Sequence, residues 1–477
     1  MTTGPRVLLV DPPFERLQGR FRAHLPLGLA ALAGALKEAG IPAAIYNAEA
    51  PRRRGEARNL RQSELCAGHD DYIKALATAD HPVWKEAEDV FCTTNPSVVG
   101  FTVMTEKFES ARILSRLVKK RLPRAFVVWG GPHPTIRPAE CVAVPEVDFA
   151  VKGEGERTIV ELAQRLFDGG SCAGIPGVFA RNGGGVTGVE RPLEPELDRL
   201  PSPDWEAGLS PLDWPARGHG RQQIMASRGC PFRCEYCAAA AMWGRKVRFH
   251  STARILKEIE TLVRLTGSRR IAFLDDSFTL NPKRTEELCH ALMASGLGIR
   301  WTCITRCDLV DEPLLRLLKR AGCQGLVFGV ESASPAILES VDKGQKIEDV
   351  DRAMAACRKV GLTYHAYYMI GFPDETESDL TMTVEHMKRC GAGYVSLNVF
   401  SPYPGSALYD RVVKMGLIPD PPEWGRYGRH TMDHPLTRHI TPERFRALAE
   451  NAFREADRVN HALPKRIRAL AARLLGR

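Results

Sequence analysis

The 477-residue chain lacks long hydrophobic runs, and none of its apolar stretches reaches the roughly 18 residues that a membrane-spanning helix needs. The apolar run near the N-terminus ends at Asp11, which is too short for a secretory signal. A large excess of one charge is also missing, since 66 basic and 57 acidic residues leave a net charge of +9. This excess permits an anionic substrate or cofactor without indicating nucleic acid. We therefore expect a cytoplasmic protein without a membrane span.

Cysteines are present in number, but most of the thirteen stand singly in apolar or helical surroundings. That pattern argues against a disulfide framework in a reducing compartment, and a small buried thiol needs no function. The exception is CPFRCEYC, in which Cys230, Cys234 and Cys237 follow an apolar, strand-like run.

The spacing of these three cysteines allows them to close on one metal centre. Three thiolates leave one iron of a four-iron cluster without a protein ligand, and a reactive small molecule can bind there. A partial zinc site and three unrelated core cysteines are the alternatives. A structural zinc ion requires four ligands, however, and no fourth Cys or His lies close by. The motif therefore predicts a catalytic iron–sulfur cluster.

Residues 1–175 alternate short apolar runs with helical periodicity, which predicts an α/β domain with an open, doubly wound, Rossmann-like parallel sheet. The predicted strands cover residues 6–10, 43–46, 98–103, 126–129 and 148–151. Ligands of such sheets bind beyond the carboxyl ends of the strands. The cofactor contacts expected there are Thr105, Gly130, Gly131 and Glu154. An insertion over about 52–88 interrupts the alternation and is predicted to be helical.

A predicted hairpin and a proline-rich linker over 176–217 lead to a second alternation over 218–410, and a helical region over 411–477 follows. Six strand–helix repeats predict a partial (β/α)6 barrel with its site at the carboxyl ends of the strands. Polar or glycine-containing groups follow five successive strands: the three cysteines, Asp275-Asp276, Thr305-Arg306, Glu331-Ser332 and Gly371-Phe372-Pro373. We expect these groups to share one site.

These features resemble the radical S-adenosylmethionine (SAM) enzymes that carry an N-terminal cobalamin (B12)-binding-type domain. The CxxxCxxC loop with an aromatic residue before its last cysteine matches the signature of those enzymes, and the resemblance spans about residues 5–410. Further matching runs are VVWGGPHPT, FAVKGEGE, IAFLDDSFTLN, FGVES and YMIGFPDET.

The resemblance implies that Cys230, Cys234 and Cys237 bind a [4Fe–4S] cluster whose fourth iron chelates SAM. It also implies the contacts of SAM with the protein. Those contacts are Tyr236 against the adenine, Asp276 at the amino group, Arg306 at the carboxylate, Glu331 or Ser332 at the ribose hydroxyls, and the backbone of Met369–Gly371 under the adenine.

The implied activity is reductive cleavage of SAM, with an electron from a donor such as flavodoxin or ferredoxin, and abstraction of hydrogen from an unactivated carbon of a small-molecule substrate. With cobalamin bound, the expected outcome is C-methylation in a biosynthetic, secondary-metabolite pathway. The Asp-x-His-x-x-Gly motif that supplies a cobalt-ligating histidine in many cobalamin folds is missing from the first domain. Members of the subgroup commonly lack it, so cobalamin would be held without that ligand.

The main alternative keeps hydrogen abstraction without methyl transfer, as in a radical SAM dehydratase, rearrangement or oxidation of a sugar or antibiotic precursor. The B12-type domain would then be retained without cobalamin. Acid–base or hydrogen-donor groups for that chemistry are Asp275, His365, Tyr367 and Tyr368. An RNA-modifying enzyme and a non-catalytic cluster or cobalamin carrier are further alternatives. The basic C-terminal tail, however, is poor in the aromatic residues on which bases stack.

Overall fold

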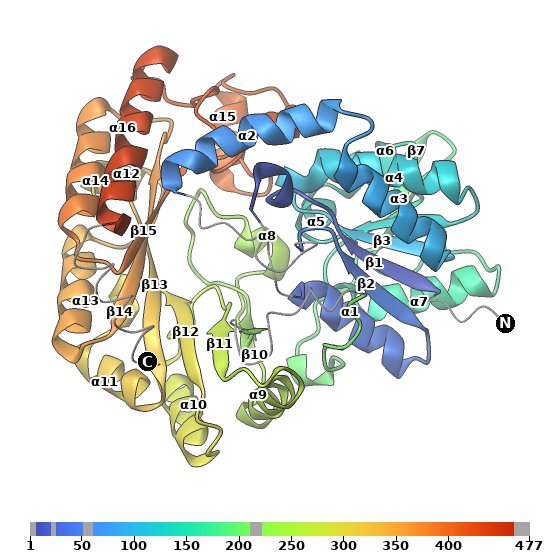
Figure 1. Ribbon diagram of the computed structural model, residues 1–477, viewed down its shortest axis with the longest axis horizontal. Helices are drawn as coiled ribbons and strands as arrows, with labels where there is room; N and C mark the ends of the chain where they lie inside the picture. Colours follow the sequence, from blue (N-terminus) through green and yellow to red (C-terminus); the bar gives the residue numbers. More distant parts are fainter. Residues whose placement is uncertain (1–5, 21–24, 51–60, 210–221, 462–477) are drawn as a thin grey trace.

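The computed structural model describes residues 6–20, 25–50, 61–209 and 222–461, which form two sheets with helices packed around them (Figure 1). The first sheet has five parallel strands in the order β2-β1-β3-β4-β5. Its strands are β1 (Val7–Asp11), β2 (Ala43–Asn47), β3 (Val98–Thr102), β4 (Phe126–Gly130) and β5 (Phe149–Val151). The strand order reverses direction at β1, so the doubly wound prediction is confirmed.

Helices cover both faces of this sheet because they form the connections between its parallel strands. The helices are α1 (Leu27–Glu38), α4 (Phe108–Arg121), α5 (Pro132–Ile136), α6 (Pro138–Ala143) and α7 (Gly155–Phe167). The predicted hairpin is formed by β6 (Val178–Asn182) and β7 (Gly185–Gly188). Because β6 pairs antiparallel with β5, the hairpin extends the first sheet past the predicted domain end at residue 175.

The second sheet has six parallel strands in the order β8-β11-β12-β13-β14-β15. They are β8 (Gln222–Ile224), β11 (Arg270–Phe273), β12 (Arg300–Thr305), β13 (Cys323–Glu331), β14 (Thr363–Ile370) and β15 (Tyr394–Val399). The helices between them are α9 (Thr252–Thr266), α10 (Pro282–Ala294), α11 (Glu312–Arg320), α12 (Pro335–Ser340), α13 (Ile347–Val360) and α14 (Glu377–Arg389). Since β8 and β15 are at opposite edges, the sheet is an open, partial barrel of the predicted kind.

The two faces of β14 differ because successive side chains of a strand point to opposite sides. Tyr364, Ala366 and Tyr368 are buried, whereas Tyr367 is 38% exposed on the opposite face. The Tyr368 hydroxyl lies 2.8 Å from Nδ1 of His386 on α14. Tyr368 therefore packs under a helix, and its expected catalytic role stays a prediction.

The insertion after β2 is helical over its described part, as predicted, and consists of α2 (Gln62–Ala77) and α3 (Pro82–Thr94). Helix α2 reaches from the first sheet to the second, where it meets α16 (Pro442–His461) beside β15 (Figure 1). The Gln62 amide donates to the Tyr394 hydroxyl at 2.9 Å and accepts from the backbone N–H of Leu397 at 3.0 Å. Asn460 of α16 bonds both backbone groups of Val395. The two helices thus provide hydrogen-bond partners for backbone groups of β15 at the edge of the sheet.

The remaining described helices are α8 (Ala239–Trp243) and α15 (Ala407–Lys414). None of the helices within the described ranges is both long and apolar enough to cross a membrane. The basic tail singled out in the sequence, residues 461–477, lies almost entirely outside the described residues.

Candidate functional site

The cysteine loop is an excursion between two short strands, β9 (Ser227–Arg228) and β10 (Arg248–Phe249), which pair antiparallel. Its first residue, Gly229, has a φ of 110°, and a Cβ there would lie 2.7 Å from the Lys246 carbonyl oxygen. Only glycine fits this close approach, so the strand pair closes the two ends of the loop on each other.

The three thiols of the loop lie close enough to influence one another electrostatically. Burial, and then the charges of Asp276, Cys234 and Cys230, raises the pKa of Cys237 to about 11. In a four-iron cluster each thiolate binds a different iron. Three thiols on one loop fit a [4Fe–4S] cluster with one open iron.

Arg306 lies directly against this loop. Its Nη1 is 3.7 Å from Cys234 Sγ and donates to the Lys343 carbonyl at 2.8 Å. Nε and Nη2 donate to the two carboxylate oxygens of Asp308 at 2.9 and 2.8 Å, and the guanidinium lies 3.8 Å from the centre of the Phe232 ring. Arg306 is therefore held beside the cluster position. Its contact with the SAM carboxylate stays a prediction.

Tyr236 and Glu331 are brought together by a lysine that the sequence analysis did not single out. Lys343 Nζ lies 2.9 Å from the Tyr236 hydroxyl and 3.1 Å from Glu331 Oε1. The Tyr236 ring makes an edge contact with Phe372, with ring centres 6.3 Å apart. Lys343 follows α12 and belongs to none of the matching motifs, so no sequence signal indicated it.

Two further predicted contacts do not face open space. Asp275 is 1% exposed, and its carboxylate accepts hydrogen bonds from the backbone of Ala226 and from the Ser227 hydroxyl. Ser332 is fully buried, with its hydroxyl 3.0 Å from that of Thr383. Both side chains stabilise local structure, and the catalytic role expected for Asp275 and the ribose contact expected for Ser332 stay predictions.

Asp276, His365 and Tyr367 remain accessible. Asp276 is exposed, and the protein atoms around it together with the Asp275 carboxylate raise its pKa to about 6. His365 is half-buried on the same face of β14 as Tyr367, with its ring 5.6 Å from that of Tyr394. These three residues stay candidates for contact with SAM or substrate.

The turn after β14 depends on a buried acid. Gly371 has a φ of 86° and donates its N–H to Glu375, which is fully buried. Met369, two residues earlier, is half-buried on the accessible face of the strand. Glu375 therefore fixes the backbone segment that is expected to pass under the adenine.

We expect Glu375→Gln to raise the melting temperature at pH 8 and to flatten its pH dependence. Burial raises the pKa of Glu375 from 4.5 to about 8, so the folded state binds this proton more tightly than the unfolded state does. The free energy of unfolding then falls as pH rises between these values, by up to about 1.4 kcal/mol for each pKa unit of difference. Thermal unfolding at pH 5, 6.5 and 8 measures the effect.

The matched control is Glu377→Gln in the same segment. The hydrogen bond from Arg444 lowers the pKa of Glu377, so its removal should not raise the melting temperature at pH 8. A Glu375→Gln variant with the pH slope of the wild type would contradict the assignment.

A cavity of about 400 Å³ lies between the carboxyl ends of the first sheet and the strands that carry the cysteine loop. Its lining combines apolar and charged residues. The apolar ones include Leu9, Leu32, Gly100, Val128, Val151 and Ile159, and the charged or polar ones include Asp11, Lys107, Glu154, Glu156, Arg228, His250, Arg254 and Glu258. Apolar surface with a few polar groups is typical of a cofactor pocket.

Gly130, Gly131 and Glu154 line this cavity at strand ends, where the sequence predicts them. Gly131 has a φ of 100°, and a Cβ there would lie 3.0 Å from the Thr102 hydroxyl. Thr105 is not among the lining residues, and its hydroxyl lies 3.1 Å from His133 Nδ1. The cofactor contact expected for Thr105 stays a prediction.

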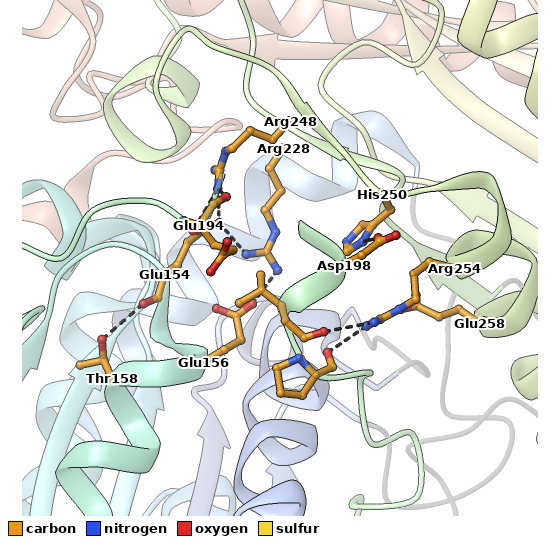
Figure 2. Close-up of polar contacts among 12 residues, drawn as sticks. Glu154, Glu156, Thr158, Glu194, Asp198, Arg228, Arg248, His250, Arg254 and Glu258 are labelled. Atoms are coloured by element: carbon orange, nitrogen blue, oxygen red, sulfur yellow. Dashed lines mark hydrogen bonds and ion pairs between the residues drawn. The ribbon is translucent and has the colours of Figure 1, made fainter. Parts of the chain in front are cut away.

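Charged residues at the cavity belong to a network that crosses between the two parts of the chain (Figure 2). Arg228 donates to Glu154 at 2.7 Å and to Glu156 at 2.6 Å. Arg248 donates to both oxygens of Glu154 and to the Glu194 carbonyl at 2.7 Å. Glu154 is a predicted cofactor contact, and both of its carboxylate oxygens already accept hydrogen bonds from arginine. Neither arginine carried a recognisable signal.

Comparison with known proteins agrees with this organisation. The Radical SAM superfamily matches residues 224–404, and the B12 binding domain family matches residues 22–163. An uncharacterized methyltransferase of Pyrococcus horikoshii is 31% identical over 458 residues, which cover 94% of this chain and 91% of that protein. Cytidylyl-2-hydroxyethylphosphonate methyltransferase of Streptomyces wedmorensis is 24% identical, covering 88% of this chain and 83% of that protein.

A solved structure shares the fold. The radical SAM methyltransferase TsrM of Kitasatospora setae, with cobalamin and a [4Fe–4S] cluster bound, superposes with a TM-score of 0.66 at 20% identity. The match covers 86% of this chain and 78% of that one. The chain therefore belongs to the radical SAM superfamily, and a B12-binding domain precedes its radical SAM domain.

Proposed function

We propose that the protein is a cobalamin-dependent radical SAM methyltransferase that methylates an unactivated carbon of a small molecule in a biosynthetic pathway. The observation that carries the proposal is the cavity between the B12-binding domain and the strands that carry the cysteine loop. A group held there would lie between the strand ends of one domain and the radical site of the other.

The residues around the cavity fit a large cofactor with an apolar body and polar edges. Gly28 at the start of α1 opens onto the cavity, with no atom within 4 Å of where a Cβ would lie. Gly100 of β3, Val128 of β4 and Ile159 of α7 contribute apolar surface to the lining. When bound, cobalamin would supply a carrier for the methyl group between SAM and substrate. The protein's part is to orient the cofactor and to exclude water.

The residues at the cysteine loop would hold the cluster and SAM. Cys230, Cys234 and Cys237 provide three thiolates, and Arg306 places a cation beside Cys234. A cation at that point suits the carboxylate of SAM. A reduced one-electron donor of the flavodoxin or ferredoxin type would supply the electron. Cysteines that serve as thiolate ligands must stay reduced, which fits a cytoplasmic location.

The alternative without methyl transfer is weakened by the positions of its candidate groups. Asp275 and Tyr368 are buried and hydrogen-bonded within the protein, which leaves only His365 and Tyr367 of the four side chains for acid–base chemistry. Among the relatives, proteins named as methyltransferases act on a phosphonate and on bacteriochlorophyllide d, and one is named a hopanoid C-3 methylase. We infer a small-molecule substrate from this range.

The test is the cofactor content of the protein after anaerobic purification and reconstitution. We expect roughly four irons for each chain and one cobalamin, detected by metal analysis and by the visible spectrum. Full iron content without any cobalamin uptake would overturn methyl transfer in favour of the cobalamin-free alternative. A reconstituted cluster that cleaves no SAM under strong reductant would indicate a non-catalytic carrier.

A further inference from the structure

The charged network of Figure 2 is attached to both ends of the cysteine loop. Arg228 lies two residues before Cys230 on β9, and Arg248 lies opposite Arg228 on β10, which follows the loop. Both arginines reach Glu154, the residue immediately before α7 in the B12-binding domain. One carboxylate thus ties both strands that bound the loop to the other domain.

The network is buried and balanced in charge. The side chains of Glu154, Glu156 and Glu194 are each 6% exposed, and those of Arg228 and Arg248 are 12% and 5% exposed. Arg157 on α7, whose side chain is 50% exposed, pairs with Glu194 at the edge of this buried group, so three carboxylates meet three guanidinium groups. Burial alone would raise the pKa of Glu154, but Arg228, the Glu194 N–H and Arg248 together lower it. Glu154 is therefore held as a carboxylate by the groups that donate to it.

Such a network fixes the relative position of the two domains more than it stabilises their contact. Buried ion pairs recover little more than the cost of removing their charges from water, and apolar residues of similar size would stabilise the contact at least as well. Arginine and carboxylate, however, meet only in a few fixed geometries. Glu154, Glu156 and Arg228 also line the cavity, so the same side chains shape the cofactor pocket and fix the loop beside it.

We propose that Arg228 and Arg248 are positioning residues that hold the cysteine loop at a fixed place relative to the cavity, so that methyl transfer stays coupled to SAM cleavage. The inference rests on the proposed function. Reductive cleavage of SAM to 5′-deoxyadenosine needs only the radical SAM domain. Transfer of the methyl group out of SAM, which leaves S-adenosylhomocysteine, needs both domains held in a fixed position relative to each other.

The experiment compares Arg228→Gln, Arg228→Lys and the wild type, each reconstituted with iron and cobalamin, with SAM and a chemical reductant. A displacement of about 1 Å can cost about a hundredfold in rate. We therefore expect Arg228→Gln to form S-adenosylhomocysteine at least about tenfold more slowly, with less than about a twofold change in 5′-deoxyadenosine. Arg228→Lys keeps the charge but not the forked geometry, so it should fall in between.

The matched control is Arg165→Gln, which removes an exposed arginine from α7, the helix that carries Glu156, outside the network, and should leave both rates unchanged. An equal fall of both products in Arg228→Gln would show a merely structural role and overturn the proposal, as would unchanged rates of both.

A second measurement separates this proposal from the proposed function. Hydrogen exchange of the backbone amides over 229–247 and the first turn of α7 needs no methyl transfer. We expect Arg228→Gln to accelerate exchange in both segments, whereas Arg165→Gln should not. Unchanged exchange would overturn the positioning role even if the wild type transfers methyl groups. A wild type that releases no S-adenosylhomocysteine would instead overturn the proposed function.

Discussion

Replacing Cys234 with alanine should abolish both iron binding and SAM cleavage. Cys234 is the middle thiol of the three and lies 3.7 Å from Arg306 Nη1, and we propose it as a ligand of the cluster, which its loss would remove. Losing an outer-shell partner of a metal site already costs 10- to 100-fold, and we expect the loss of a ligand to cost more than roughly a hundredfold. Iron content and 5′-deoxyadenosine formation after anaerobic reconstitution measure both effects.

The control for this prediction is Cys92→Ala. Cys92 is an exposed thiol on α3, outside the cysteine loop, and its removal should change neither iron content nor SAM cleavage. SAM cleavage that survives in Cys234→Ala would contradict the assignment of the loop and the account built on it.

Replacing Gly28 with phenylalanine should abolish cobalamin binding while the fold and the cluster persist. Gly28 lines the cavity, its φ is not in the left-handed region, and a Cβ there would meet no atom within 4 Å. A larger side chain therefore fits without backbone strain, and it also favours the helix. Its ring would occupy space that the cofactor needs. We expect the Kd for cobalamin to rise at least about a hundredfold, which corresponds to about 2.7 kcal/mol.

Gly185→Phe provides the matched control, because Gly185 on β7 also has open space around its Cβ position and lies outside the cavity lining. This variant should bind cobalamin like the wild type. Iron content and 5′-deoxyadenosine formation should be normal in both variants, since the cysteine loop is untouched. Tight cobalamin binding by Gly28→Phe would exclude this cavity as the cofactor site.

Most of the fold could be predicted because its signals are local. Short apolar runs that end at glycine or polar residues indicated every strand from β1 to β5 within one or two residues. The hairpin was also indicated by its turn over 182–185, but its membership of the first sheet was not. Pairing of β6 with β5 joins Phe179 to Ala150 across the sheet, and no local pattern encodes such a contact.

The site could be predicted in part for the same reason. The three cysteines lie within one loop, so their spacing alone placed them together. The burial of Asp275, Ser332 and Tyr368 could not be predicted, because a position at or near a strand end does not determine which way a side chain points. Lys343 was missed although Glu331 is only 12 residues away, since its contact with Tyr236 spans 107 residues, and the contact of Arg228 with Glu154 spans 74. An isolated lysine or arginine carries no signal of its own.

The most direct test of the central claim is to measure both products of SAM in one preparation. Enzyme loaded with iron and cobalamin is incubated anaerobically with SAM and a strong reductant, and S-adenosylhomocysteine and 5′-deoxyadenosine are quantified. We predict that both form, that Cys234→Ala loses 5′-deoxyadenosine, and that Gly28→Phe loses S-adenosylhomocysteine alone. Release of 5′-deoxyadenosine without S-adenosylhomocysteine, at full iron and cobalamin content, would contradict cobalamin-dependent methyl transfer.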